Sequence, residues 1–140
     1  MRWGWGQRPG RGGACKLKNR VMSNDELPQL ASLIGEQLSA VIFVADYIQF
    51  DFNGSRLTVF SRPVVEVRGH RERFPEHGSR DALCALIQQE VTSASAREGD
   101  GIEIAFRSGA HLLISVKPGT YDGPEAATFS HPNAPGLLVW

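Results

Sequence analysis

The chain has 140 residues, of which 41% are hydrophobic and 21% charged, and its formal net charge at pH 7 is zero. This length suits one domain and is too short for two, and no run approaches the roughly 18 apolar residues that a membrane helix needs. Cys15 and Cys84 form neither a Cys-x-x-Cys pair nor a zinc-ligand cluster, and no apolar signal-peptide core is present. We therefore expect one soluble, cytoplasmic domain without a membrane segment.

The two signs of charge are unevenly distributed along the chain. Residues 1–21 hold six cations and no acid, so residues 22–140 keep nine cations against all 15 carboxylates, a formal charge of −6. An acidic domain repels phosphate backbones and suits a basic partner. A charge of this size is also ordinary for solubility, and on charge alone we favour that interpretation. The functional alternative is a basic protein partner.

Residues 1–21 are rich in Gly and Arg and show no helical or strand periodicity. They predict a disordered basic extension, followed by a single domain over 22–140. One interpretation is an arm that contacts nucleic acid by charge and stacking. Another is that translation starts at Met22. We favour the second, because such arms usually accompany a basic domain.

The first predicted elements are a helix and a β-hairpin. Ser23 and Glu26 have the spacing of a capping box, and Gly35 is suited to end that helix. Strands are predicted over 37–44 and 47–52, before Asn53-Gly54, which is typical of a type I′ turn. A two-residue turn fixes the expected pairs: Phe50 with Leu57, Ile48 with Val59, Asp51 with Arg56, and Gln49 with Thr58.

A second helix and hairpin are predicted further along the chain. An extended segment over Val64–Val67 leads into a polar loop, Arg68–Arg80, and then a helix from about Ser79 to Gln89. A three-residue loop, Arg107–Gly109, with Gly109 in the left-handed conformation, joins the last two of three strands and pairs Ile104 with Leu112 and Ile102 with Ile114. These strands are expected near 90–97, 101–106 and 110–117.

The two predicted hairpins belong to stretches of similar pattern. Leu33 to Pro63 and Leu86 to Pro118 both contain a helix end, a strand, a hairpin, a basic residue and a proline, at an offset that rises from 53 to 55. The pattern predicts an α+β domain: a mainly antiparallel β-sheet from two related β-hairpin units with two short helices. Gly123–Ala127 suits a helical turn, and Leu137–Trp140 a last strand that docks on the sheet.

No catalytic centre is predicted. The sequence has no nucleophile elbow and no phosphate-binding loop, and Ser130-His131 reads as a turn, so we expect no catalytic residue and no cofactor. A weak metal alternative uses His70, His77 and Asp81, with Glu72 and Glu76 nearby, as in a small metal-dependent hydrolase. Their spacing matches no familiar ligand pattern.

Short motifs in the second half support a resemblance. Arg80-Asp81-Ala82-Leu83, Gly123-Pro124-Glu125-Ala126 and Val139-Trp140 resemble elements of small uncharacterised bacterial proteins of a domain-of-unknown-function type. Some proteins of this kind are immunity proteins, which bind and silence a toxin. The resemblance implies no particular functional residue.

These observations lead to one functional hypothesis, a non-enzymatic protein-binding module that inhibits a basic toxin domain by electrostatic complementarity. The candidate contacts are exposed carboxylates: Asp46, Glu72, Glu76, Glu98 and Asp100.

Overall fold

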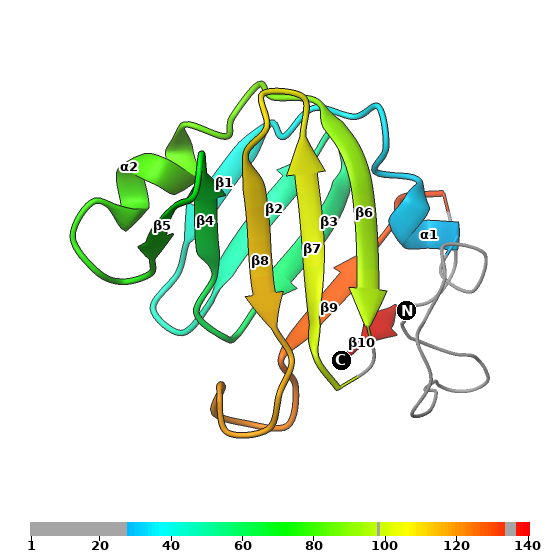
Figure 1. Ribbon diagram of the computed structural model, residues 1–140. Helices are drawn as coiled ribbons and strands as arrows, with labels where there is room; N and C mark the ends of the chain where they lie inside the picture. The colour runs from blue at the N-terminus through cyan, green and yellow to red at the C-terminus, as the bar shows by residue number, and fades with distance from the viewer. Residues whose placement is uncertain (1–27, 98, 134–136) are drawn as a thin grey trace.

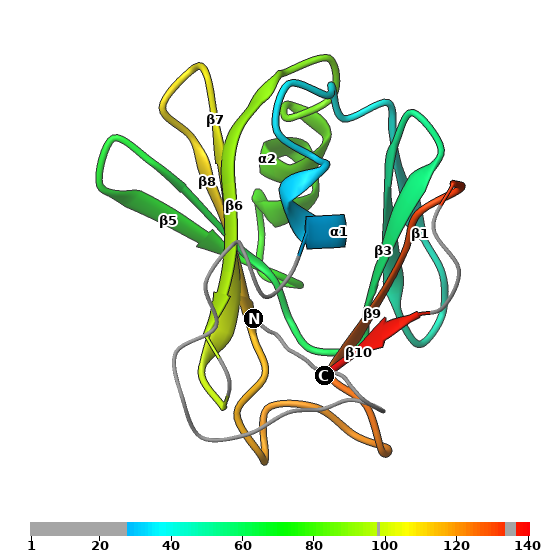
Figure 2. The ribbon, with the colours of Figure 1, turned by 90° about the vertical axis from the view of Figure 1, so that its right-hand side faces the viewer.

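The structure is a computed structural model that describes residues 28–97, 99–133 and 137–140. Two five-stranded antiparallel sheets lie face to face, and two short helices lie between them at opposite edges, α1 beside β6 and α2 beside β1 and β4 (Figures 1 and 2). The elements, in chain order, are α1 (Pro28–Ala31), β1 (Ala40–Phe43), β2 (Ile48–Phe52), β3 (Ser55–Val59), β4 (Val64–Val67), β5 (His70–Arg73), α2 (Ser79–Cys84), β6 (Val91–Arg97), β7 (Gly101–Phe106), β8 (His111–Ser115), β9 (Ala127–Ser130) and β10 (Leu138–Val139).

The predicted α+β class is wrong. Both layers of the described domain are antiparallel sheets, and the helices contribute only four and six residues. The second helix was predicted to run to Gln89 but ends at Cys84, because the chain continues in turns through Gln88, at φ 77°, to enter β6. Ser23 and Glu26 lie outside the described residues. None of the described helices is long and apolar enough to cross a membrane.

Two further local predictions are wrong. The expected polar loop Arg68–Arg80 contains a strand, β5, which pairs with β4 from His70 to Arg73. The Gly123–Ala127 segment forms no helical turn, because Ala127 begins β9 and pairs with Val59. In both cases a long-range strand partner supplies backbone hydrogen bonds that local sequence signals do not reveal.

The predicted hairpin registers are confirmed. Phe50 pairs with Leu57 and Asp51 with Arg56 across the first hairpin, and Asn53 and Gly54 adopt positive φ angles of 55° and 106°. The second hairpin pairs Ile104 with Leu112 and Ile102 with Ile114. The predicted C-terminal strand is present as β10, which pairs with β9.

Each half of the chain contributes strands to both sheets. The first half forms β1-β2-β3 and then sends the β4–β5 hairpin to the other sheet, where β4 pairs with β8. The second half forms β6-β7-β8 and sends the β9–β10 hairpin back, where β9 pairs with β3. The sheet orders β1-β2-β3-β9-β10 and β6-β7-β8-β4-β5 are therefore the same pattern with the two hairpins exchanged (Figure 1).

The two halves meet at a short bridge with pseudo-twofold symmetry. Gln37 forms a β-bridge with Glu90, and Glu90 is the residue that corresponds to Gln37 in the second half, at an offset of 53 residues. The backbone hydrogen bonds around this bridge come in two pairs, and the two bonds of each pair are related by the same offset. In the first pair, Leu38 N donates to Gln89 O at 3.1 Å and Val91 N to Glu36 O at 2.9 Å. In the second, Gly35 N donates to Val91 O at 2.8 Å and Gln88 N to Leu38 O at 2.7 Å. The repeat seen in the sequence thus extends to backbone hydrogen bonding.

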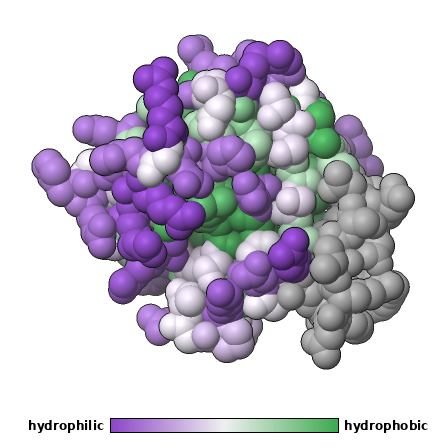
Figure 3. All heavy atoms as spheres, in the orientation of Figure 1, coloured by the Kyte–Doolittle hydropathy of each residue, from purple (hydrophilic) through white to green (hydrophobic). Residues whose placement is uncertain are grey.

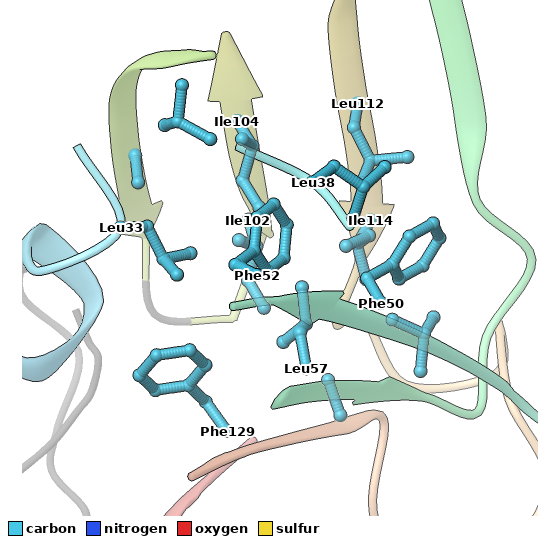
Figure 4. Packing of buried hydrophobic residues seen from close by; sticks show 14 of the residues in the cluster. Leu33, Leu38, Phe50, Phe52, Leu57, Ile102, Ile104, Leu112, Ile114 and Phe129 are labelled. Atoms are coloured by element: carbon cyan, nitrogen blue, oxygen red, sulfur yellow. The ribbon is translucent and has the colours of Figure 1, made fainter. Parts of the chain in front are cut away.

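The hydrophobic core fills the space between the sheets. Phe50, Phe52, Leu57 and Phe129 enter it from one sheet, and side chains of β7 and β8 enter it from the other (Figure 4). Leu33 and Leu38 also point into it, and both are fully buried. Burying each of these side chains stabilises the folded state by about 1.5–3 kcal/mol. Because the side chains come from both sheets, the core depends on both sheets being present.

The equivalence of Gly35 and Gln88 generates a first prediction. Both have positive φ, 91° and 77°, but only glycine adopts that conformation without steric cost. We expect Gln88→Gly to raise the free energy of unfolding by about 1 kcal/mol, measured by urea denaturation. The matched control is Gln37→Gly at the bridge itself, which should lower the free energy of unfolding. If Gln88→Gly were less stable than the unsubstituted protein, the positive φ of Gln88 would not be strained.

A second prediction concerns Asp51 in the first hairpin. Burial alone would raise its pKa, but the Gly54 amide at 2.8 Å and Arg56 at 3.0 Å together hold the pKa below its ordinary value. Ionised Asp51 therefore contributes to the free energy of unfolding at pH values above the unfolded-state pKa of about 3.9. This contribution is lost as the pH falls through the lower folded-state pKa. Asp51→Asn should cost stability at pH 7, and the difference from the unsubstituted protein should shrink toward pH 2 in urea titrations. A difference independent of pH would contradict this.

Candidate binding groove

A groove of about 980 Å³ runs across the outer face of the sheet formed by β5, β4, β8, β7 and β6. The strand registers place one side chain from each strand in a row along it: Arg73, Val64, Leu113, Glu103 and Ser95. A second row, toward the end where the chain crosses between sheets, contains Ser115, Gly101 and Arg97. The groove is therefore built on a continuous sheet surface.

The floor of the groove is apolar and its rim is polar. Val64 is 9% exposed and Leu113 is half-buried, and they are neighbours on β4 and β8. In the space-filling view of this face, hydrophobic surface lies in a hollow surrounded by hydrophilic residues (Figure 3). An apolar centre inside a polar rim is the usual anatomy of a protein-binding surface.

The groove collects most of the cations of an otherwise acidic domain. Five of the nine cations of residues 22–140 line it: Arg62, Arg71, Arg73, Arg97 and Lys117. Arg71 pairs with Glu66 at 3.5 Å and Lys117 with Asp100 at 3.6 Å. The other three, Arg62, Arg73 and Arg97, are exposed and form no ion pair or hydrogen bond with any described residue.

Four carboxylates also line the groove. Asp100 is held by Lys117, and Glu103 lies 2.7 Å from His111 Nδ1. Glu76 and Asp122 have no ion-pair partner among the described residues. The charges left open for a ligand are thus three arginines and two carboxylates.

Small side chains open the groove on only one of the two sheets. When the two hairpins are aligned by their strand pairs, Tyr47 in the first is equivalent to Gly101 in the second. In the same alignment, Phe60 is equivalent to Ser115. The rings of Tyr47 and Phe60 pack at 5.6 Å in the first sheet. In the second sheet, glycine and serine occupy these two positions, so no aromatic pair stands there. Aromatic rings reach the groove from other segments, as Phe60, Phe74 and Tyr121.

The structure separates the predicted contact carboxylates. Asp46 lies in the turn between β1 and β2, and Glu72 lies on β5 with His70 Nε2 at 2.9 Å. Glu76 and Asp100 both line the groove, and Glu98 lies outside the described residues. Of the four that the structure describes, two are therefore brought to a common surface.

The alternative sites have no supporting geometry. His70 lies on β5, His77 in the turn before α2, and Asp81 in α2. Across residues 28–97, 99–133 and 137–140, no three His, Cys, Asp or Glu side chains are close enough to share a metal ion. His111, like His70, contacts a carboxylate. The basic segment 1–21 lies outside the described residues.

Sequence reasoning missed the groove and its three arginines. Arg62 and Arg73 lie on either side of β4 in the first half of the chain, whereas Arg97 ends β6 in the second half, and the exchange of hairpins brings all three to one face. One signal was present in the sequence. Aligning the two hairpins sets Gly101 and Ser115 against Tyr47 and Phe60, which marks the face that is left uncovered.

The position of Gly101 generates a third prediction. A Cβ atom there would lie 2.7 Å from the backbone oxygen of Ile114, which cannot move without distorting β8. We expect Gly101→Ala to lower the free energy of unfolding by about 1–3 kcal/mol, measured by urea denaturation. Ser95→Ala, on the neighbouring strand of the same face, should change it by less than about 0.5 kcal/mol. Equal stability of the two variants would contradict the close approach.

Comparison with known proteins gives no further assignment. Scans against protein-family models, curated proteins and solved structures find no match.

Proposed function

We propose that this chain is a non-enzymatic protein-binding module of the immunity-protein kind, which binds a toxin domain through the groove and blocks it. The observation that carries the proposal is the apolar floor of Val64 and Leu113 within a rim that holds three arginines without an ion-pair partner among the described residues. Arginine is enriched at protein interfaces because its planar guanidinium donates several hydrogen bonds and also packs on apolar surface. Such a rim suits a protein surface.

The dimensions of the groove favour a macromolecular partner. It crosses five strands, and four spacings between neighbouring strands amount to about 19 Å. Its floor belongs to a hydrogen-bonded sheet, which is a rigid platform that loses little conformational entropy on binding. The class of inhibitor comes from the resemblance to immunity proteins.

The acidic charge of the domain acts at longer range. Residues 22–140 carry a formal charge of −6, which attracts a basic toxin domain and speeds its encounter at low salt. The predicted carboxylates Asp46 and Glu72 are spread over the surface outside the groove, which suits steering better than a single contact patch. In this proposal, net charge guides the approach and the groove makes the contact.

The test begins with the genes beside this one, in which the proposal expects a basic toxin domain. Neutralisation of that domain is then measured as growth of cells that express both proteins and as affinity by calorimetry. Leu113→Glu places a charge in the apolar floor and should weaken binding by about 2 kcal/mol, roughly 30-fold, and abolish protection. The matched control is Thr58→Glu at the equivalent position of the other sheet, which should still protect.

Two outcomes would overturn the proposal. One is that the chain neither binds nor protects against the toxin. The other is that Leu113→Glu protects as well as the unsubstituted chain while retaining its folded stability in urea.

A further inference from the structure

Two of the three arginines that pair with no described residue lie at the ends of the groove, and the third lies beside its floor. Arg73 lies on β5 and Arg97 at the end of β6, which are the two edge strands of this sheet. Arg62 lies just before β4, next to the apolar floor. A ligand that reaches Arg73 and Arg97 together must span about 19 Å, which an extended polypeptide covers with about six residues.

We propose that the groove receives an extended acidic segment of the partner, with carboxylates at its two ends and an apolar side chain over Val64 and Leu113. This inference rests on the proposed function, in which the groove is the protein-binding face. Charge complementarity identifies the segment, because guanidinium groups bind carboxylates through paired, charge-assisted hydrogen bonds. A segment with lysines at its ends would place like charges together.

The remaining carboxylates of the rim set the spacing of the acidic groups. Glu76 and Asp122 line the groove and are not neutralised by any described residue, so they oppose a segment that is acidic at every position. The favoured segment therefore has few carboxylates, placed to reach Arg62, Arg73 and Arg97. Its centre is apolar, because the floor offers Val64 and Leu113 rather than hydrogen-bonding groups.

The experiment measures binding of two fluorescein-labelled peptides to the full chain by fluorescence anisotropy. Both have about eight residues with leucine at the centre, enough to cover the span; one carries glutamates at its ends and the other lysines. We expect the glutamate peptide to bind at least tenfold more tightly, and its affinity to fall as salt rises. Equal affinity of the two peptides, or tighter binding of the lysine peptide, would overturn the inference.

The variants assign the binding to the three arginines. The combined Arg62→Gln, Arg73→Gln and Arg97→Gln variant should lose at least tenfold in affinity for the glutamate peptide. The matched control is Arg68→Gln, which removes another exposed arginine without an ion-pair partner among the described residues, in the turn between β4 and β5 and outside the groove lining. The single variants are measured as well, in case the combined variant is unstable. Unchanged affinity in all arginine variants would overturn the inference.

The toxin assay separates this inference from the proposed function. If Leu113→Glu abolishes toxin binding but the arginine variants do not, the groove remains the binding face and the acidic segment is wrong. If no toxin is bound but the glutamate peptide binds through the arginines, the inhibitor role is wrong and the chemistry of the groove stands.

Discussion

The fold depends on the exchange of two hairpins across a pseudo-twofold bridge at Gln37 and Glu90. Neither β1-β2-β3 nor β6-β7-β8 has its complete sheet until the other half supplies β9–β10 or β4–β5. A sheet that is apolar on one face needs a second layer against which to bury it. The exchange completes both layers at once, so the core between them, with Phe50 and Phe52 at its centre, belongs to both halves.

The same exchange creates the groove. The β4–β5 hairpin of the first half carries Val64 and Arg73 to β8 of the second half, where Leu113 lies. Arg97 comes from the opposite edge of that sheet. The apolar floor thus joins one residue from each half, and a change that weakens the exchange would disturb the groove together with the core.

The outer faces of the two sheets carry different side chains. The first sheet retains the aromatic pair of Tyr47 and Phe60, and its outer face carries Gln49, Thr58 and Thr128 in a row. The second sheet has glycine and serine in place of that pair, and an apolar pair at its centre. Two related units can therefore keep one scaffold while their outer faces differ, because the buried positions maintain the fold and the outward positions change independently.

The sequence by itself determined the two hairpins, their registers and the repeat, because Asn53-Gly54 and the loop ending at Gly109 fix which residues face each other and alternation fixes which side is buried. It did not determine the class of fold: the apolar spacing after Ser79 suited a long helix, yet the chain turns at Gln88 to reach β6. Nor did it reveal β5, whose charged residues resemble a loop until β4 pairs with them. Only the tertiary structure decided which hairpin joins which sheet, and hence that Arg62, Arg73 and Arg97 line one groove, because pairing between distant strands is favoured only when it closes a shared core.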